Sequence, residues 1–168
     1  MSKKKTSKSA DPRVQVVKTK SGAAGATTVR ETPATPPDDA RKAAWPVRAA
    51  DEGKALATLC AKSIADDKCE DVMILDVRGV CQICDFIVLG TGTSDRQIRA
   101  AADHVEEAAR ERDEKVYHVS GYDEGAWVVV DFVDVVVHLF SGDMRAYYDL
   151  ESLWGDGVRV DWQSTATN

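Results

Sequence analysis

The stretch AWVVVDFVDVVVHLF, residues 126–140, decides the fold of this chain. It holds two short runs rich in valine, which meet at residues 132–134. β-branched residues favour extended backbone, and apolar runs of this length are typical of strands. The stretch therefore predicts two strands, 126–132 and 134–140, joined by a tight turn around Val133.

Helical patterns lie on both sides of these strands. A helix is expected to begin near Ala49, because apolar residues recur there at helical spacing and place Cys60 in the core. Ser94 followed by Gln97 is a capping box, and it predicts a second helix with a buried stripe made mostly of alanine. A short third helix fits residues 143–154.

Three further apolar runs, 71–77, 83–90 and 115–121, read as strands. The predicted order is then α, β, β, α, β, β, β, α. Such an order predicts an α/β fold, a single domain with a mixed β-sheet flanked by helices.

Charge and composition divide the chain into three parts. Residues 1–48 carry 11 Lys+Arg against 4 Asp+Glu, are rich in Ser, Thr, Ala and Pro, and show no apolar periodicity. We expect a disordered basic tail there, with a transit peptide as the alternative. The domain is placed at 49–157 and a flexible tail at 158–168. Residues 49–168 carry 11 Lys+Arg against 24 Asp+Glu, which disfavours direct binding to nucleic-acid phosphates and favours a basic protein partner.

The chain shows no apolar run long enough to span a membrane, and no secretory signal follows the lysines at its start. We therefore expect a soluble, cytoplasmic protein with no membrane partner. Its four cysteines are expected to be reduced thiols in that compartment.

Asp134 and His138 are the first candidates for catalysis, because an Asp–His pair can act as a general base. On one strand they share a face but lie four residues apart, roughly 13 Å, which is too far for contact. A two-metal site would need carboxylates two residues apart on a strand, whereas Asp131 and Asp134 are three apart. The pattern predicts no catalytic residues.

Two other motifs suggest ligands. Cys81 and Cys84 form CQIC, the spacing of redox and zinc motifs, but this one enters a strand and has no second CxxC. The segment GTGTSDRQ, 90–97, could offer backbone amides to an anion, but it lacks the GxGxxG spacing and the Walker lysine. We expect no cofactor and no metal.

Aromatic residues gather toward the C-terminal end, where Trp127, Tyr147, Tyr148 and Trp154 accompany charged side chains. This composition is typical of a protein interface, and it equally fits aromatics that cover a sheet.

Four segments carry a resemblance to a known family: DVMILDVRG (71–79), CDFIVLGTGTSDRQIRAAADHVEEA (84–108), HVSGYDEGAWVVVDFVDVVVHLF (118–140) and RAYYDLESLWGD (145–156). Over about residues 52–157 the chain resembles the ribosomal silencing factor family, also called the Iojap-like family. The resemblance implies a nucleotidyltransferase-like fold without the catalytic carboxylates.

The resemblance also implies a function and a set of contact residues. Such a protein is a translation repressor that binds the large ribosomal subunit through large-subunit protein fourteen and sterically blocks the small subunit when nutrients are scarce. A nucleotidyltransferase-like enzyme is the alternative. The sequence leaves open whether the free protein is a homodimer, and whether the tail touches rRNA. The positions that match the family motif, and so are the candidates for partner binding, are Trp127, Asp131, Asp134, His138, Arg145, Tyr148, Glu151, Leu153 and Trp154.

Three residues depart from the family pattern. Cys84 stands where Thr is usual, Ser120 where Glu is usual, and Val133 where the turn normally has Gly. A β-branched residue tolerates positive φ poorly, so we expect an altered or strained turn at Val133.

Overall fold

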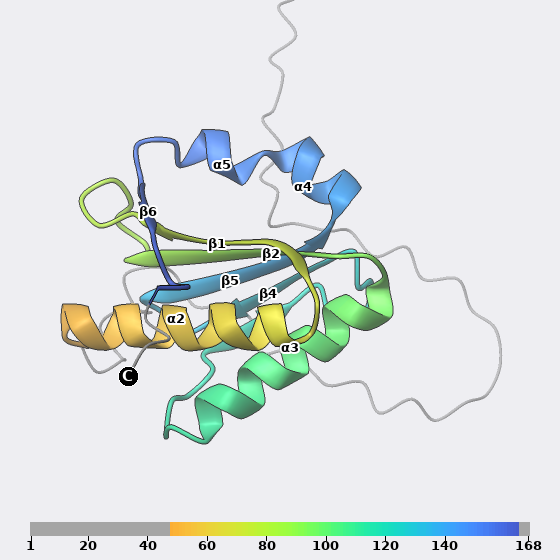
Figure 1. Ribbon diagram of the computed structural model, residues 1–168, viewed down its shortest axis with the longest axis horizontal. Coiled ribbons are helices and arrows are strands. Elements are labelled where there is room, and N and C mark those ends of the chain that lie inside the picture. Colours follow the sequence, from red (N-terminus) through yellow and green to blue (C-terminus); the bar gives the residue numbers. More distant parts are fainter. Residues whose placement is uncertain (1–47, 165–168) are drawn as a thin grey trace, which may run out of the picture. The chain divides into compact units, whose positions relative to one another are not determined.

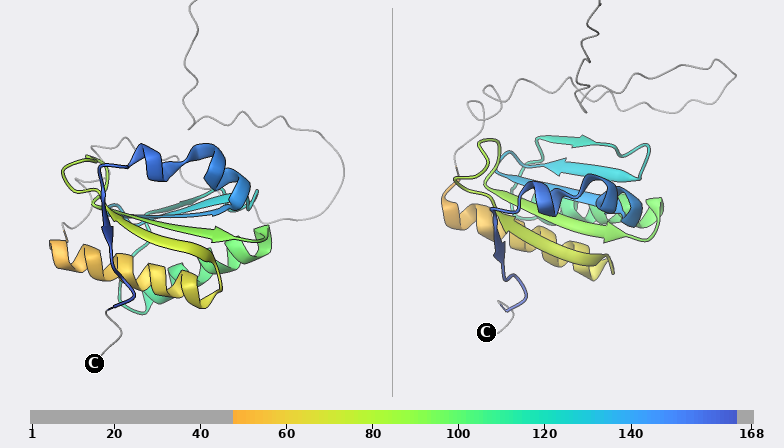
Figure 2. Two further views of the ribbon diagram at one scale, coloured as in Figure 1. Left: turned by 45° about the horizontal axis from the view of Figure 1, so that its top comes forward. Right: turned by 90° about the horizontal axis from the view of Figure 1, so that it is seen from above.

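Residues 48–164 are described by the computed structural model. They form a six-stranded mixed sheet with helices on both faces, as Figures 1 and 2 show. The helices are α2 (Ala50–Asp66), α3 (Asp95–Arg110), α4 (Gly142–Tyr148) and α5 (Leu150–Leu153). The strands are β1 (Glu70–Asp76), β2 (Phe86–Gly92), β3 (His118–Ser120), β4 (Trp127–Asp131), β5 (Val135–Ser141) and β6 (Val158–Val160). The predicted α/β class with a mixed sheet is confirmed.

The sheet order is β3-β4-β5-β2-β1-β6. The central strands β2 and β5 pair in parallel, from Phe86 opposite Val135 to Gly92 opposite Ser141. The other neighbours pair antiparallel. Because β2 and β5 are covered on both faces, they read as continuous apolar runs rather than alternating ones.

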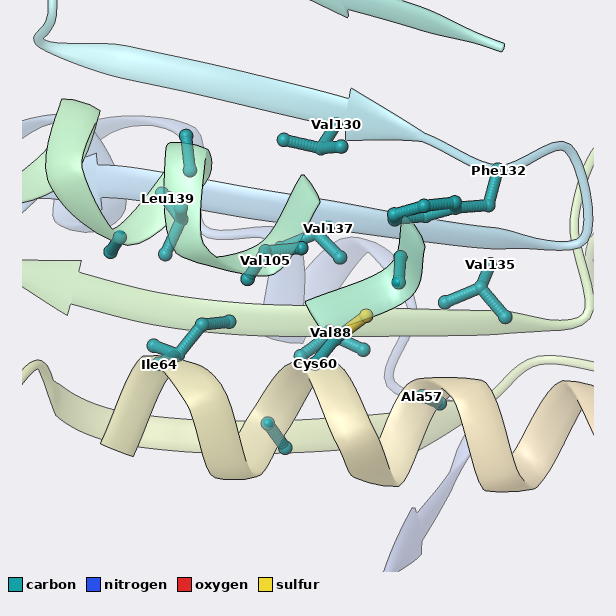
Figure 3. Packing of buried hydrophobic residues seen from close by; sticks show 14 of the residues in the cluster. Ala57, Cys60, Ile64, Val88, Val105, Val130, Phe132, Val135, Val137 and Leu139 are labelled. Carbon is teal, nitrogen blue, oxygen red and sulfur yellow. The ribbon is translucent and has the colours of Figure 1, made fainter. Parts of the chain in front are cut away.

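α2 and α3 pack on one face of the sheet and form the larger core with it (Figures 1 and 3). Cys60 lies in this core, as predicted. The alanine stripe of α3 lets the helix approach the sheet closely, with Ala101 and Ala102 fully buried. At Gly90, a Cβ atom would lie 2.6 Å from Cγ2 of Ile64, so only glycine fits beneath α2.

The N-terminus of α3 is capped largely as the sequence predicts. The Ser94 hydroxyl accepts a hydrogen bond of 3.2 Å from the backbone N of Gln97. The Gln97 side chain reaches back one residue further than a capping box requires, because its Oε1 accepts from the backbone N of Thr93 at 2.8 Å.

The predicted ends of the domain need two corrections. Val158–Val160 form strand β6, antiparallel to β1, so the domain continues past 157 and the boundary predicted there is wrong. A run of three residues is too short to give a strand signal of its own. At the other end, Arg48 belongs to the folded part and not to the tail. The rest of the predicted tail, 1–47, lies outside the described residues.

The predicted helix at 143–154 is two helices. Asp149 separates them with a left-handed backbone (φ 42°), and its carboxylate accepts a hydrogen bond from the backbone N of Ser152, which caps α5. Asp tolerates this conformation better than most residues, so the break is encoded locally. In residues 48–164, none of the helices is long and apolar enough to cross a bilayer.

Candidate protein-docking surface

The second face of the sheet carries α4 and α5 over a smaller apolar cluster. Alternation along the strands sends Trp127 and Val129 of β4, and Val136 and Phe140 of β5, to this face. α4 and α5 are short, seven and four residues, so they cover only part of it (Figure 1). The two faces of the sheet therefore differ in how completely they are covered.

Trp127 is the centre of an aromatic group at the edge of α4. Its ring centroid lies 4.4 Å from that of Tyr148 and 6.0 Å from that of Phe140. Tyr147 stacks edge-on against Tyr148, with centroids 5.0 Å apart and an interplanar angle of 82°. Edge-to-face and tilted contacts of this kind stabilise aromatic pairs beyond their burial, so the group is preorganised.

His138 supports this group from β5. The indole Nε1 of Trp127 donates a hydrogen bond of 3.3 Å to Nδ1 of His138. Burial lowers the pKa of His138 to about 4, so the imidazole is neutral at physiological pH. Because Nδ1 accepts a hydrogen bond, the ring proton is on Nε2. His138 therefore orients Trp127.

Arg145 ties α4 to the sheet and to α5. Its Nη1 donates to the backbone O of Asp71 and to Oγ1 of Thr91, each at 2.8 Å, and its Nε donates to Glu151 at 2.7 Å. The guanidinium also lies 5.7 Å from the ring centroid of Phe140. Arg145 and Glu151 thus form a mostly buried ion pair that holds α5 against the β1 edge.

A cavity of about 440 Å³ opens beside this ion pair. Arg145 and Glu151 line it together with Met73, Arg159 and Trp162. Its lining mixes charged and aromatic groups, which suits a side chain of a protein partner.

The outer side of α4 and α5 exposes large apolar side chains. Tyr147 is 80% exposed, Leu153 is 65% exposed and Tyr148 is 41% exposed. Trp154 and Leu150 point the other way and pack in the smaller cluster, where they anchor α5. We call the three aromatic residues Trp127, Tyr147 and Tyr148, together with the aliphatic Leu153, the aromatic surface. The family motif did not include Tyr147, although its exposure is the greatest of the four.

The predicted contact residues Asp131 and Asp134 lie elsewhere. Asp131 pairs with Val136 at the far end of β4 from Trp127, and its Oδ1 accepts a hydrogen bond from the backbone N of Val133 at 2.7 Å. Asp134 accepts a hydrogen bond of 3.1 Å from Arg48. Both carboxylates therefore stabilise the β4–β5 turn, and the structure does not bring them to the aromatic surface.

That turn has the strain expected at Val133, whose φ is 78°. The backbone N of Asp134 donates to the O of Phe132 at 3.1 Å, a three-residue γ-turn centred on Val133. This turn type is rare and strained. The side chain of Val133 is buried, which favours valine there in spite of the backbone conformation.

The geometry gives the catalytic alternatives no support. Asp134 binds Arg48 while His138 binds Trp127, so the two do not form a general base. Among residues 48–164 there is no cluster of three or more His, Cys, Asp or Glu side chains that could hold a metal ion. The GTGTSDRQ segment enters α3 through the cap at Ser94.

Comparison with known proteins agrees with the resemblance seen in the sequence. The family model described as "Ribosomal silencing factor during starvation" matches residues 50–168. The chain is 39% identical to the ribosomal silencing factor of Bacillus subtilis over 108 residues, which cover 64% of this chain and 92% of that protein. It is 34% identical over 98 residues to an Iojap-related mitochondrial protein of Arabidopsis thaliana, covering 55% of this chain and 53% of that protein.

Solved structures show the same likeness. A crystal structure of a Chromobacterium violaceum protein has 33% identity and a TM-score of 0.59, covering 61% of this chain and 85% of that one. A Bacillus halodurans structure has 35% identity and a TM-score of 0.57, covering 64% and 98%. With the family model matching well over half of the residues, the chain belongs to the ribosomal silencing factor family.

Proposed function

We propose that this protein binds the large ribosomal subunit through its aromatic surface and blocks joining of the small subunit, and so represses translation under nutrient limitation. The partner on the subunit is large-subunit protein fourteen. The protein acts in the cytoplasm by steric exclusion and without catalysis.

The observation that carries the proposal is the exposed apolar surface on an acidic domain. Tyr147, Tyr148 and Leu153 of α4 and α5 are all exposed, although large apolar side chains usually lie inside. Residues 49–168 carry 24 Asp+Glu against 11 Lys+Arg. An acidic domain is attracted to a basic ribosomal protein and repelled by bare rRNA phosphates, so electrostatics favours a protein contact on the subunit.

The surface also has the anatomy of an interface. Aromatic residues are the side chains that most often dominate binding energy, and here they are held in place before any partner arrives. Trp127 is fixed by His138, and Tyr148 packs on Trp127. Arg145 and Glu151 support α5, so we assign them a positioning role and assign direct contact to the aromatic surface.

Co-sedimentation with separated ribosomal subunits tests the proposal. The full chain should pellet with large subunits and not with small ones, and it should reduce the formation of joined ribosomes. If the protein ignores large subunits at low salt, the proposal fails.

Two substitutions with equal change of charge locate the contact. Leu153→Asp should weaken binding to large subunits by roughly 10- to 100-fold, because it places a charge in an apolar contact. Ala55→Asp on the exposed side of α2 is the matched control and should leave binding within about twofold, since surface changes outside an interface have small effects. Equal losses in the two variants would place the contact elsewhere. Circular dichroism checks that both remain folded.

A further inference from the structure

Cys81 and Cys84 lie in the loop between β1 and β2, and the proposed function makes no use of them. Their sulfur atoms are 3.8 Å apart. The backbone N of Ile83 donates to Sγ of Cys81 at 3.3 Å, which directs this sulfur toward Cys84. All four cysteines of the chain are reduced thiols in the structure.

The loop holds both ends of the pair in place. The backbone N of Cys81 donates to the O of Val77 at 2.8 Å, and the backbone N of Asp85 donates to the O of Asp134 at 2.8 Å. A disulfide needs a sulfur separation of about 2.05 Å, so the sulfurs must approach by a little under 2 Å. A change of side-chain rotamer can move a sulfur by that distance.

The two thiols differ in access. Cys81 is half-buried, whereas Cys84 is only 4% exposed. A disulfide reagent therefore reaches Cys81 first, and Cys84 is then close enough to attack the mixed disulfide.

The other two cysteines are protected. Burial raises the pKa of Cys60 to about 12 and that of Cys69 to about 11. Thiolates are the reacting species, so both react more slowly than an ordinary thiol at neutral pH.

We propose that Cys81 and Cys84 are a reversible redox site that forms an intramolecular disulfide by exchange with a low-molecular-weight disulfide. The thiolate of Cys81 attacks the reagent and forms a mixed disulfide, which releases the first small thiol. The thiolate of Cys84 then attacks Sγ of Cys81 and releases the second. Two protein thiols are oxidised, one small disulfide is reduced to two thiols, and two protons leave the protein.

The site belongs to the smaller apolar cluster on the sheet face that carries α4 and α5. Cys81 and Cys84 belong to the same apolar cluster as Met144 of α4, Leu150 of α5 and Trp154. A disulfide in this cluster changes the side-chain packing against α5. We therefore expect oxidation to change the tryptophan emission through Trp154.

Mass spectrometry tests the proposal on the full chain without ribosomes, so its outcome is independent of the proposed function. Trypsin cleaves after Arg78 and Arg96, and residues 79–96 contain both cysteines of the pair and no other Lys or Arg. After treatment with oxidised glutathione, this peptide should lose the mass of two hydrogen atoms and regain it with dithiothreitol. A peptide that stays reduced, or carries only glutathione, would overturn the proposal.

Three variants separate the steps. Cys84→Ser should retain glutathione on Cys81, because the resolving thiol is missing, and Cys81→Ser should leave the peptide without a disulfide. Cys69→Ser is the control and should oxidise like the unaltered protein. Formation of the same disulfide with no change in tryptophan emission would overturn the coupling to α5.

Discussion

Replacement of Arg48 by alanine should destabilise the domain strongly, although residue 48 precedes the first helix. The Arg48 side chain is 9% exposed and holds three acceptors. Its Nη1 donates to the O of Phe132 at 3.2 Å and to Oδ2 of Asp134 at 3.1 Å, and its Nε donates to Glu114 at 3.1 Å. One guanidinium thus joins the β4–β5 turn to the segment after α3.

The size of the effect follows from what remains after truncation. Removing one partner of a buried ion pair typically costs about 3 to 5 kcal/mol, because a charge stays buried and unpaired. The side chains of Asp134 and Glu114 are 15% and 25% exposed, so water can reach them in part. We therefore expect a loss of about 2 to 3 kcal/mol in the free energy of unfolding, which lowers Tm by roughly 10 °C in a domain of this size.

Urea unfolding followed by circular dichroism measures this loss. Arg110→Ala is the matched control, because its guanidinium is 78% exposed and lies 3.5 Å from Glu107. An exposed pair of this kind contributes at most about 0.5 kcal/mol. Losses that agree within about 0.5 kcal/mol for the two variants would refute the role given to Arg48.

Three other predictions test the geometry. At Val133, where φ is 78°, the glycine variant should be nearly as stable as the alanine variant. Relief of about 1 to 2 kcal/mol of backbone strain offsets the lost methyl group and the greater chain entropy of glycine in the unfolded state. At buried Val130 in β4, the glycine variant should be less stable than the alanine variant by more than about 1 kcal/mol. Urea unfolding of the four variants decides this, and an equal gap at both positions would contradict the strain. Burial holds the pKa of His138 at about 4 in the folded protein, below its unfolded value near 6.5. The contribution of this group to the free energy of unfolding is therefore fully present above pH 6.5 and is lost as pH falls toward 4, by up to about 3 kcal/mol. Thermal unfolding between pH 7 and 4 should show a smaller loss for His138→Gln than for the unaltered protein. Arg145→Leu leaves Thr91 and Glu151 without their donor and should cost about 2 to 3 kcal/mol, whereas Glu151→Gln keeps an acceptor for the guanidinium and should cost less than Arg145→Leu in the same urea assay.

The long helices and strands, and the faces that they bury, could be predicted from the sequence because they depend on neighbouring residues along the chain. Helix α3 illustrates this: its cap at Ser94 and its alanine stripe can be read from neighbouring residues, and both are present. Strands β4 and β5 and the strained turn at Val133 were also predicted.

The two misses at the ends of the domain have a common cause in distant contacts. Strand β6 has three residues and exists because it pairs with β1. Arg48 stands at the end of a low-complexity stretch, and its partners are 66 to 86 residues away along the chain. No local pattern records such a contact, so the domain extends beyond its predicted boundaries at both ends.

The candidate site shows the same division between local and distant information. Alternation along β4 and β5 predicts which side chains share a face, but it does not say how much of that face is covered. The covering depends on α4 and α5, which end after seven and four residues because Asp149 turns the chain between them. One longer helix would give Tyr147 and Leu153 other directions, whereas the break leaves both side chains exposed, with Tyr147 against Tyr148 and Tyr148 against Trp127. We therefore expect Arg145 and Asp149, which hold this arrangement, to affect the proposed docking by positioning α4 and α5.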